Sequence, residues 1–247
     1  AKVEDIDRLV TERTRAIILN SPGNPCGNIY TPEELRAIAA IAEKNDIYII
    51  SDEIYNQLVY DGDSVVSIAS LSDAAKQHTI VINGASKTYA MTGWRIGYTA
   101  CESQLAGAMT RWQSHATSNP NSIAQAAYLA ALTGSQQCVR DMAIQFEKRR
   151  NYMVDRIWKI PGVDCIKPKG AFYVMMDIHA IKGKSYAGQI VNNGTDFAEL
   201  LLREAKVALV PGAGFGDDDY VRMSYATSME DIAAGMDRIE QVIATMA

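Results

Sequence analysis

Short apolar runs that end in polar residues recur along the first hundred residues, and this alternation restricts the fold more than any other feature. The runs RAIILN, IYIIS and TIVIN occupy residues 15–20, 47–51 and 79–83. Continuous apolar runs are typical of strands buried on both faces of a parallel sheet. Helical patterns lie between the runs. The alternation therefore predicts an α/β fold, with a mostly parallel sheet covered by helices.

The clearest helix start lies between the first two runs. Thr31 supplies an N-cap, Pro32 suits the first helical position, and Glu34 completes a capping box. Apolar residues then repeat at helical spacing, at Leu35, Ile38, Ala39 and Ala42. A further strand is expected at residues 96–100.

The pattern is helical from residue 102 to about residue 158, and it changes after Pro161. The segment 136–158 reads as one long connecting helix. A second, smaller α/β domain is expected beyond it, with strands at residues 171–177, 207–210 and 220–225 and helices at residues 195–205 and 229–246. We therefore expect a large domain over residues 1–145 and a small C-terminal domain over residues 146–247.

Composition narrows the classes of partner. The net charge of −5 comes from charges scattered along the chain, without the basic stripe that a nucleic acid requires. The cysteines and histidines are dispersed, so neither a metal site nor a disulfide framework is expected. No apolar run approaches the roughly 20 residues of a membrane helix, and the charged start is unlike a signal peptide. A cytoplasmic protein without membrane contact is expected.

Polar residues follow the carboxyl ends of the predicted strands. In parallel α/β sheets, ligands bind beyond these ends. These residues are Asn24, Asp52, Ser86 and Lys87. Their side chains suit a cofactor that carries an aldehyde, a pyridine nitrogen, a phenolic oxygen and a phosphate. Lys87 can form an imine with the aldehyde, and Asp52 can hold the pyridine nitrogen protonated.

The other parts of such a cofactor also find partners. Ser86 and Arg95 suit phosphate oxygens, and Tyr55 and Asn24 are donors suited to the phenolic oxygen. Each of these residues alone has an ordinary explanation, such as a helix cap, a turn or a solvated surface. The cofactor hypothesis rests on their occurrence together.

Four motifs make the resemblance to a family specific. NPCG at residues 24–27, SDEIY at 51–55, SKTYAMTGWRIGY at 86–98 and VRMSYA at 221–226 resemble the successive signatures of class I/II pyridoxal-phosphate-dependent aminotransferases, of fold type I and similar to aspartate aminotransferase. The resemblance implies that Lys87 also shuttles the proton of the substrate's α-carbon. It implies that Arg222 grips the substrate α-carboxylate, with Asn24 beside the substrate.

The resemblance further implies pyridoxal 5′-phosphate as cofactor, a homodimer, and transfer of an amino group from an L-amino acid to a 2-oxo acid. Aspartate and 2-oxoglutarate are the first expectation for the substrates, with aromatic or alanine donors open. Two alternatives remain: a carbon–sulfur β-lyase of the same fold, and an aminotransferase-like sensor domain of a transcription regulator, which would have a winged helix upstream.

Family members carry, ahead of the matched region, a glycine-containing phosphate turn, an aromatic residue stacked on the cofactor and a segment that closes over the substrate. No residues here correspond to these parts. We therefore expect a longer natural polypeptide, and weak cofactor binding and poor turnover by these 247 residues alone. PGAGFG at residues 211–216 has the wrong spacing for a dinucleotide loop and reads as a flexible turn. AFYVMMD at residues 171–177 reads as a core strand.

Overall fold

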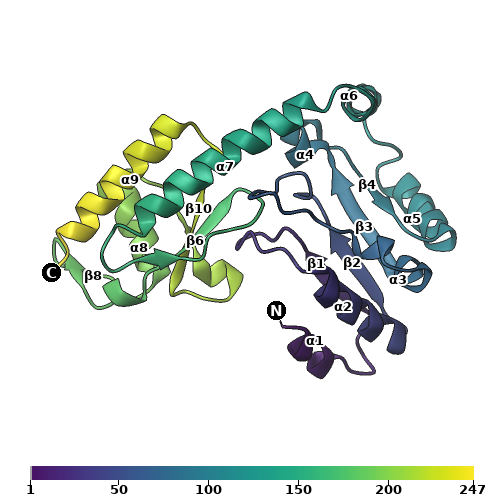
Figure 1. The fold of residues 1–247 in the computed structure, drawn as a ribbon, viewed down its shortest axis with the longest axis horizontal. Helices are drawn as coiled ribbons and strands as arrows, with labels where there is room; N and C mark the ends of the chain where they lie inside the picture. The colour runs from purple at the N-terminus through teal and green to yellow at the C-terminus, as the bar shows by residue number, and fades with distance from the viewer. Residues whose placement is uncertain (1) are drawn as a thin grey trace. The chain divides into compact units, whose positions relative to one another are not determined.

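The computed structural model describes residues 2–247, which pack as two compact units (Figure 1). The first unit comprises the described residues up to Gly23 together with Asn28–Met142, and the second comprises Asn24–Gly27 together with Ala143–Ala247. The boundary lies within the long helix α7 (Gln137–Ile157). The four residues Asn24–Gly27 are the one part of the N-terminal sequence that clusters with the C-terminal unit.

The first unit is built on a four-stranded sheet with the order β1-β2-β3-β4. The strands are β1 (Ala16–Asn20), β2 (Tyr48–Asp52), β3 (Thr79–Gly84) and β4 (Gly97–Ala100). The first three are parallel, and β4 runs antiparallel to β3. The predicted α/β class and mostly parallel sheet are confirmed.

Helices precede, connect and follow these strands. They are α1 (Val3–Leu9), α2 (Pro32–Lys44), α3 (Asp73–His78), α4 (Ala85–Thr88), α5 (Ser103–Ala116) and α6 (Ser122–Thr133). Helix α2 begins at the predicted capping box, in which Thr31 Oγ1 accepts from the Glu34 N–H and the Glu34 carboxylate accepts from the Thr31 N–H.

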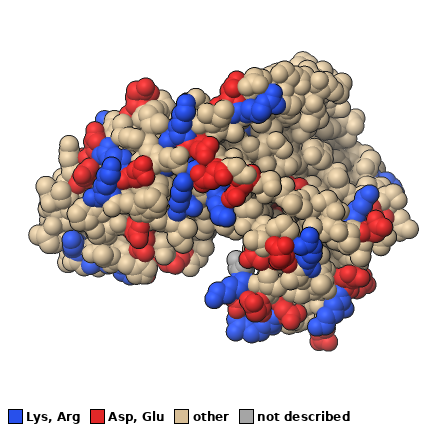
Figure 2. All heavy atoms as spheres, viewed as in Figure 1, with Lys and Arg blue, Asp and Glu red and all other residues tan. Residues whose placement is uncertain are grey.

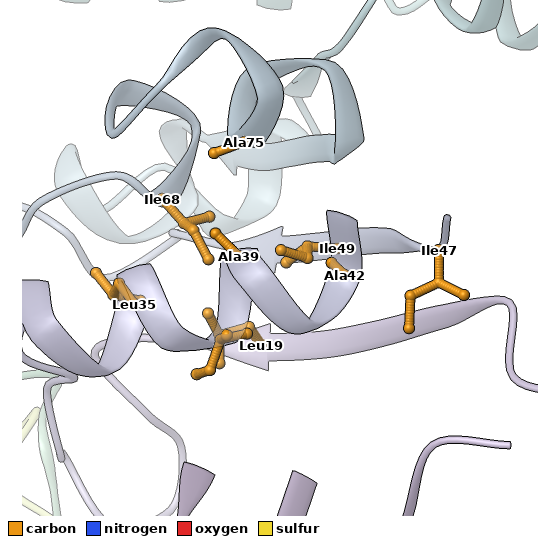
Figure 3. Close-up of a cluster of buried hydrophobic side chains, with 9 residues drawn as sticks. Leu19, Leu35, Ala39, Ala42, Ile47, Ile49, Ile68 and Ala75 are labelled. Atoms are coloured by element: carbon orange, nitrogen blue, oxygen red, sulfur yellow. The ribbon is translucent and has the colours of Figure 1, made fainter. Parts of the chain in front are cut away.

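A buried apolar cluster joins one face of the sheet to α2 and α3 (Figure 3). It comprises Leu19, Leu35, Ile38, Ala39, Ala42, Ile47, Ile49, Ile68 and Ala75. The residues of α2 recur at helical spacing and meet alternate residues of β1 and β2, so one stripe of the helix covers one face of the sheet. This packing fixes the strand ends on which the candidate site is built.

The second unit contains a four-stranded antiparallel sheet with the order β5-β6-β10-β9. Its strands are β5 (Asp164–Cys165), β6 (Tyr173–Asp177), β9 (Val210–Pro211) and β10 (Tyr220–Ser224). The unit also contains a two-stranded hairpin of β7 (Ser185–Tyr186) and β8 (Gln189–Ile190). Helix α8 (Gly194–Leu200) continues into a π-helical turn (Leu201–Ala205), and the C-terminal helix is α9 (Met229–Ala244).

Most predicted elements of this unit are present within one or two residues of their expected ends. The strand expected at residues 207–210 differs, because β9 begins only at Val210. Lys206, just before the expected strand, has a left-handed φ of 55°, which ends the preceding helical turn, and the chain pairs with β10 only from Val210. None of the helices in the described part of the chain is both long and apolar enough to span a bilayer.

Candidate active site

Lys87 and Tyr55 come together at the carboxyl edge of the first sheet. Lys87 lies on α4, directly after β3, and Tyr55 follows β2. The two strands are parallel neighbours, so their carboxyl ends meet at one edge. The Lys87 Nζ lies 5.8 Å from the centroid of the Tyr55 ring, and Tyr55 is only 4% exposed. The amine of the half-buried Lys87 therefore lies near a buried ring.

Asp52 is the last residue of β2, and backbone contacts hold its position. It is in register with Asn20 of β1 and Ile82 of β3. Its carboxylate Oδ1 accepts a hydrogen bond from the Ile54 N–H at 3.2 Å. Its carbonyl oxygen accepts from the Asn20 side-chain amide at 3.1 Å and from the Ser21 N–H at 3.2 Å. A half-buried carboxylate is thus fixed at the same edge as Lys87.

Ser86 and Arg95 reach this edge by different routes. Ser86 is the half-buried neighbour of Lys87 on α4. Arg95 comes just before β4, whose first residue pairs with the last residue of β3. Arg95 is exposed and has a left-handed φ of 51°, and its Nη1 donates to the Thr92 carbonyl at 2.8 Å. Ser86 thus supplies a hydroxyl on the same short helix as Lys87, whereas the recorded contact of the Arg95 guanidinium is with the Thr92 carbonyl.

The pairing of Gly84 with Gly97 makes this geometry possible. A Cβ on Gly84 would lie 2.9 Å from the Gly97 Cα and 2.9 Å from the Ile96 carbonyl oxygen. A Cβ on Gly97 would lie 2.8 Å from the Asn83 carbonyl oxygen. The two backbones approach too closely for any side chain, which explains why both positions are glycine.

Glu53 is a buried carboxylate that the sequence analysis did not single out. It is 6% exposed and accepts hydrogen bonds from the Ser51 hydroxyl at 3.1 Å and the Ser67 hydroxyl at 2.6 Å. Its N–H donates to the Ile82 carbonyl. Glu53 thereby fixes the turn between Asp52 and Tyr55. Burial, reinforced by the negative charge of Glu53, also raises the pKa of Tyr98 on β4.

Arg222 and Asn24 meet in the second unit. Arg222 lies on β10, and its Nη1 donates to the Asn24 Oδ1 at 2.8 Å. The contacts of Asn24 therefore place it with the predicted carboxylate-binding arginine. Both residues were predicted beside the substrate, but Asn24 was grouped with the strand-end residues of the large domain.

The NPCG segment is held within this unit through Gly27. The N–H groups of Lys169 and Gly170 both donate to the Gly27 carbonyl at 2.9 Å. Gly27 has a φ of 62°, and a Cβ there would lie 2.5 Å from the Gly170 carbonyl oxygen. Arg150, which is fully buried, donates from Nη1 to the Pro168 carbonyl at 2.8 Å. A buried guanidinium thus supports the loop that fixes Asn24, and nothing in the sequence pattern marked Arg150.

Two aromatic rings lie against Arg222 and were also missed. The Arg222 Cζ is 4.4 Å from the centroid of Tyr173 and 4.9 Å from that of Phe215. The sequence analysis assigned Tyr173 to a core strand and Phe215 to a flexible turn. Tyr173 is indeed buried in β6, but it also contacts the arginine.

The charges on the face drawn in Figure 2 are mixed, with basic and acidic side chains interspersed. Within residues 2–247, no group of three or more His, Cys, Asp or Glu side chains is arranged to hold a metal ion.

Comparison with known proteins identifies a family. The family model described as aminotransferase class I and II matches residues 1–239. The chain is 47% identical over 244 residues to an aspartate aminotransferase of Geobacillus stearothermophilus, a match that covers 99% of this chain and 61% of the relative. It is 45% identical to the aspartate aminotransferase of Bacillus subtilis, with 97% and 60% covered. The chain thus spans about three fifths of the length of these relatives.

Solved structures show the same fold. The aspartate aminotransferase of Rhizobium meliloti matches with a TM-score of 0.97 and 38% identity, over 100% of this chain and 62% of that chain. The aromatic aminotransferase of Pyrococcus horikoshii matches with a TM-score of 0.91 and 37% identity, over 99% and 64%. The predicted resemblance is confirmed: this chain belongs to the class I and II aminotransferase family and has its fold type I architecture.

Proposed function

We propose that the protein transfers an amino group between an L-amino acid, with aspartate as the first candidate, and a 2-oxo acid such as 2-oxoglutarate, with pyridoxal 5′-phosphate as cofactor. The observation that carries the proposal is the convergence of Lys87, Tyr55 and Asp52 at the carboxyl edge of two parallel strands. The names of the relatives support aspartate as amino donor.

The residues at this edge fit the chemical groups of the cofactor. Ser86 and Arg95 supply a hydroxyl and a guanidinium for phosphate oxygens, and Tyr55 supplies a phenol donor. The Asp52 carboxylate, fixed by the Ile54 N–H, can face a protonated ring nitrogen. When bound, pyridoxal phosphate supplies an aldehyde that reacts with amines and a ring that accepts electrons. The first compact unit is accordingly proposed as the cofactor-binding domain.

The residues of the chain then have distinct tasks. Lys87 Nζ would hold the cofactor covalently, and the same amine would serve as the base for the proton on the substrate α-carbon. Asp52 keeps the ring nitrogen protonated by its negative charge. Arg222 binds the substrate α-carboxylate through two parallel N–H donors, and Asn24 fixes the guanidinium from one side.

Borohydride reduction with peptide mapping tests the cofactor assignment. Reduction of the cofactor-loaded protein should fix the cofactor on Lys87 alone. In Lys87→Ala the label should disappear, and transamination should fall by roughly 10²- to 10⁴-fold, as expected for loss of a proton-transferring group. Lys76→Ala, an exposed lysine of the same unit, should behave like the wild type. A label on any other lysine would disprove the site.

A substrate screen tests the reaction. Other relatives are named aspartate/prephenate aminotransferase and asparagine–oxo-acid transaminase, so asparagine and prephenate belong beside aspartate in the screen. A transaminase converts the bound cofactor to its amine form when an amino acid is added without a 2-oxo acid. Release of pyruvate and ammonia from a cysteine conjugate would instead identify a β-lyase.

The assembly and location are part of the same proposal. We propose a two-fold homodimer in the cytoplasm, because isologous dimers are the commonest soluble assembly and family resemblance favours one. Sedimentation equilibrium at several protein concentrations tests the dimer, and a monomer at all of them would contradict it.

A further inference from the structure

The guanidinium of Arg222 lies against two aromatic rings that come from different parts of the second unit. Its Cζ is 4.4 Å from the centroid of Tyr173 and 4.9 Å from the centroid of Phe215, while Nη1 donates to Asn24. Both distances lie within the range of cation–π contacts. The rings and the amide together restrain the side chain in three places.

The register of the sheet explains the position of Tyr173. Arg222 on β10 pairs with Met175 on β6, and Ser224 pairs with Tyr173. Arg222 and Tyr173 are thus diagonal neighbours on one face of an antiparallel pair, where long and aromatic side chains reach each other. Tyr173 is 8% exposed, so the sheet and its surroundings fix the ring.

The glycines of the PGAGFG segment explain the position of Phe215. Arg222 pairs with Val210 of β9, and the 3-10 turn Gly212–Phe215 follows that strand directly. A Cβ on Gly212 would collide with the carbonyl oxygens of Asp217 and Tyr220, so the turn packs against the start of β10 only with glycine there. The segment predicted as a flexible turn is therefore packed at Gly212, and its exposed part brings Phe215 to Arg222.

We propose that Tyr173 and Phe215 are positioning residues for Arg222, and that they hold its guanidinium plane so that the N–H edge receives the substrate's α-carboxylate as a rigid fork. This inference rests on the proposed function and adds two residues to it. Rings bind the flat faces of a guanidinium, whereas a carboxylate binds in its plane, so the two kinds of contact do not compete. A guanidinium that is already restrained loses less conformational freedom when the carboxylate binds.

The expected effect is on binding rather than on the chemical step. The α-carboxylate is held alike before and during the reaction, so loss of the restraint raises KM and leaves kcat nearly unchanged. A single cation–π contact at a partly exposed position corresponds to roughly a two- to fivefold change in affinity. Amino acid and 2-oxo acid should be affected equally, because both carry this carboxylate.

Phe215→Leu is the main variant, because Phe215 is 37% exposed and its replacement threatens the fold little. Two readouts independent of turnover are needed. Arginine side-chain NMR reports the ring currents on Arg222 without any ligand, and calorimetric titration with succinate, an unreactive dicarboxylate, reports the affinity of the cofactor-loaded protein. Phe215→Tyr keeps a ring and should behave like the wild type in both. Tyr186→Leu in the β7–β8 hairpin is the matched aromatic control.

In Phe215→Leu, the Arg222 resonance should move toward the position of a solvated arginine, and succinate should bind two- to fivefold more weakly. An unchanged resonance and unchanged succinate affinity would overturn the inference, as would an equal effect of Tyr186→Leu. Arg222→Lys separates this outcome from a failure of the proposed function. If Phe215→Leu changes neither the resonance nor the succinate affinity while Arg222→Lys abolishes succinate binding, only the inference fails. If neither variant changes succinate binding, the assignment of Arg222 fails, and the inference fails with it.

Discussion

His179 shows how a single residue can make this fold sensitive to pH. Its Nδ1 lies 2.8 Å from Asp177 Oδ1, and its Nε2 lies 2.9 Å from Asp219 Oδ2. The hydrogen bond with Asp177 is the main cause that raises the pKa of His179, and the charge of Asp219 adds to it while Lys182 opposes it. Lys182 in turn pairs with Asp219 and lowers the pKa of that carboxyl group. The cluster ties the end of β6 to the start of β10.

This geometry predicts a loss of stability as the pH rises. The folded-state pKa of His179 lies above the unfolded value of about 6.5. Protonated His179 therefore stabilises the fold fully below about pH 6.5, and this stabilisation is lost as the pH rises through the folded-state pKa. The lowered pKa of Asp219 acts at the acidic end, where stability falls as that carboxylate becomes protonated. The difference in urea-unfolding free energy between wild type and His179→Gln should therefore shrink above about pH 6.5.

NMR titration of the His179 ring provides the control for this prediction. The midpoint should lie above about 6.5 in the wild type and move down in Asp177→Asn, which removes the principal partner. A wild-type midpoint at or below that of an unstructured histidine would contradict the prediction.

Among the elements, α2 offers the clearest test of local stability. Thr31 Oγ1 accepts from the Glu34 N–H at 3.2 Å, and Glu34 Oε2 accepts from the Thr31 N–H at 2.8 Å. Thr31→Ala should destabilise the protein by about 1 kcal/mol in urea unfolding. Thr110→Ala is the matched control, because that hydroxyl only donates to the Ala106 carbonyl within α5 and caps nothing. A loss in Thr110→Ala as large as in Thr31→Ala would argue against the cap.

The close pairing of Gly84 on β3 with Gly97 on β4 connects the sheet to the candidate site. In Gly84→Ala the new methyl group would meet backbone atoms of Gly97 and Ile96 at 2.9 Å, so the strand ends must separate. We expect a loss of about 1–3 kcal/mol in stability and weaker binding of pyridoxal phosphate, since the end of β3 that leads into Ser86 and Lys87 must shift. Gly93→Ala is the control, because no atom lies within 4 Å of its added Cβ. Equal cofactor affinity in both variants would show that the close approach of Gly84 and Gly97 does not position the site.

These elements also show what the sequence could predict and what it could not. Strand and helix positions followed from local patterns, since each apolar run or capping box specifies its own element. The meeting of Asp52, Tyr55 and Lys87 at one edge followed from parallel topology. The ring contacts of Tyr173 and Phe215 depend on the register between β6, β9 and β10, and a register between strands far apart in sequence leaves no local signal.

At the scale of the whole chain, one face of the first sheet differs from the other. Leu19 and Ile49 are buried beneath α2, whereas Ile18 is 76% exposed, Tyr48 41% and Ile82 36%. The register places Ile18 beside Ile50 and Ile80 on this second face. The sequence predicted strands that are apolar on both sides. Within residues 2–247, however, helices bury only one side of the sheet at β1. The second face thus exposes apolar side chains at Ile18, Tyr48 and Ile82, next to the polar Asn20 and Asp52 at the strand ends.

This surface should bind an apolar dye in the 247-residue protein. Ile18→Thr replaces an exposed apolar side chain with a polar one of similar strand preference, so stability should change little while fluorescence of the dye anilinonaphthalene sulfonate falls. Ile166→Thr is the matched control, because Ile166 is 89% exposed but does not belong to this sheet face. Dye binding scales with the area of contiguous apolar surface rather than with the exposure of one residue, so only Ile18→Thr should lower the fluorescence. An equal fall in both variants would show that this sheet face is not the principal dye site.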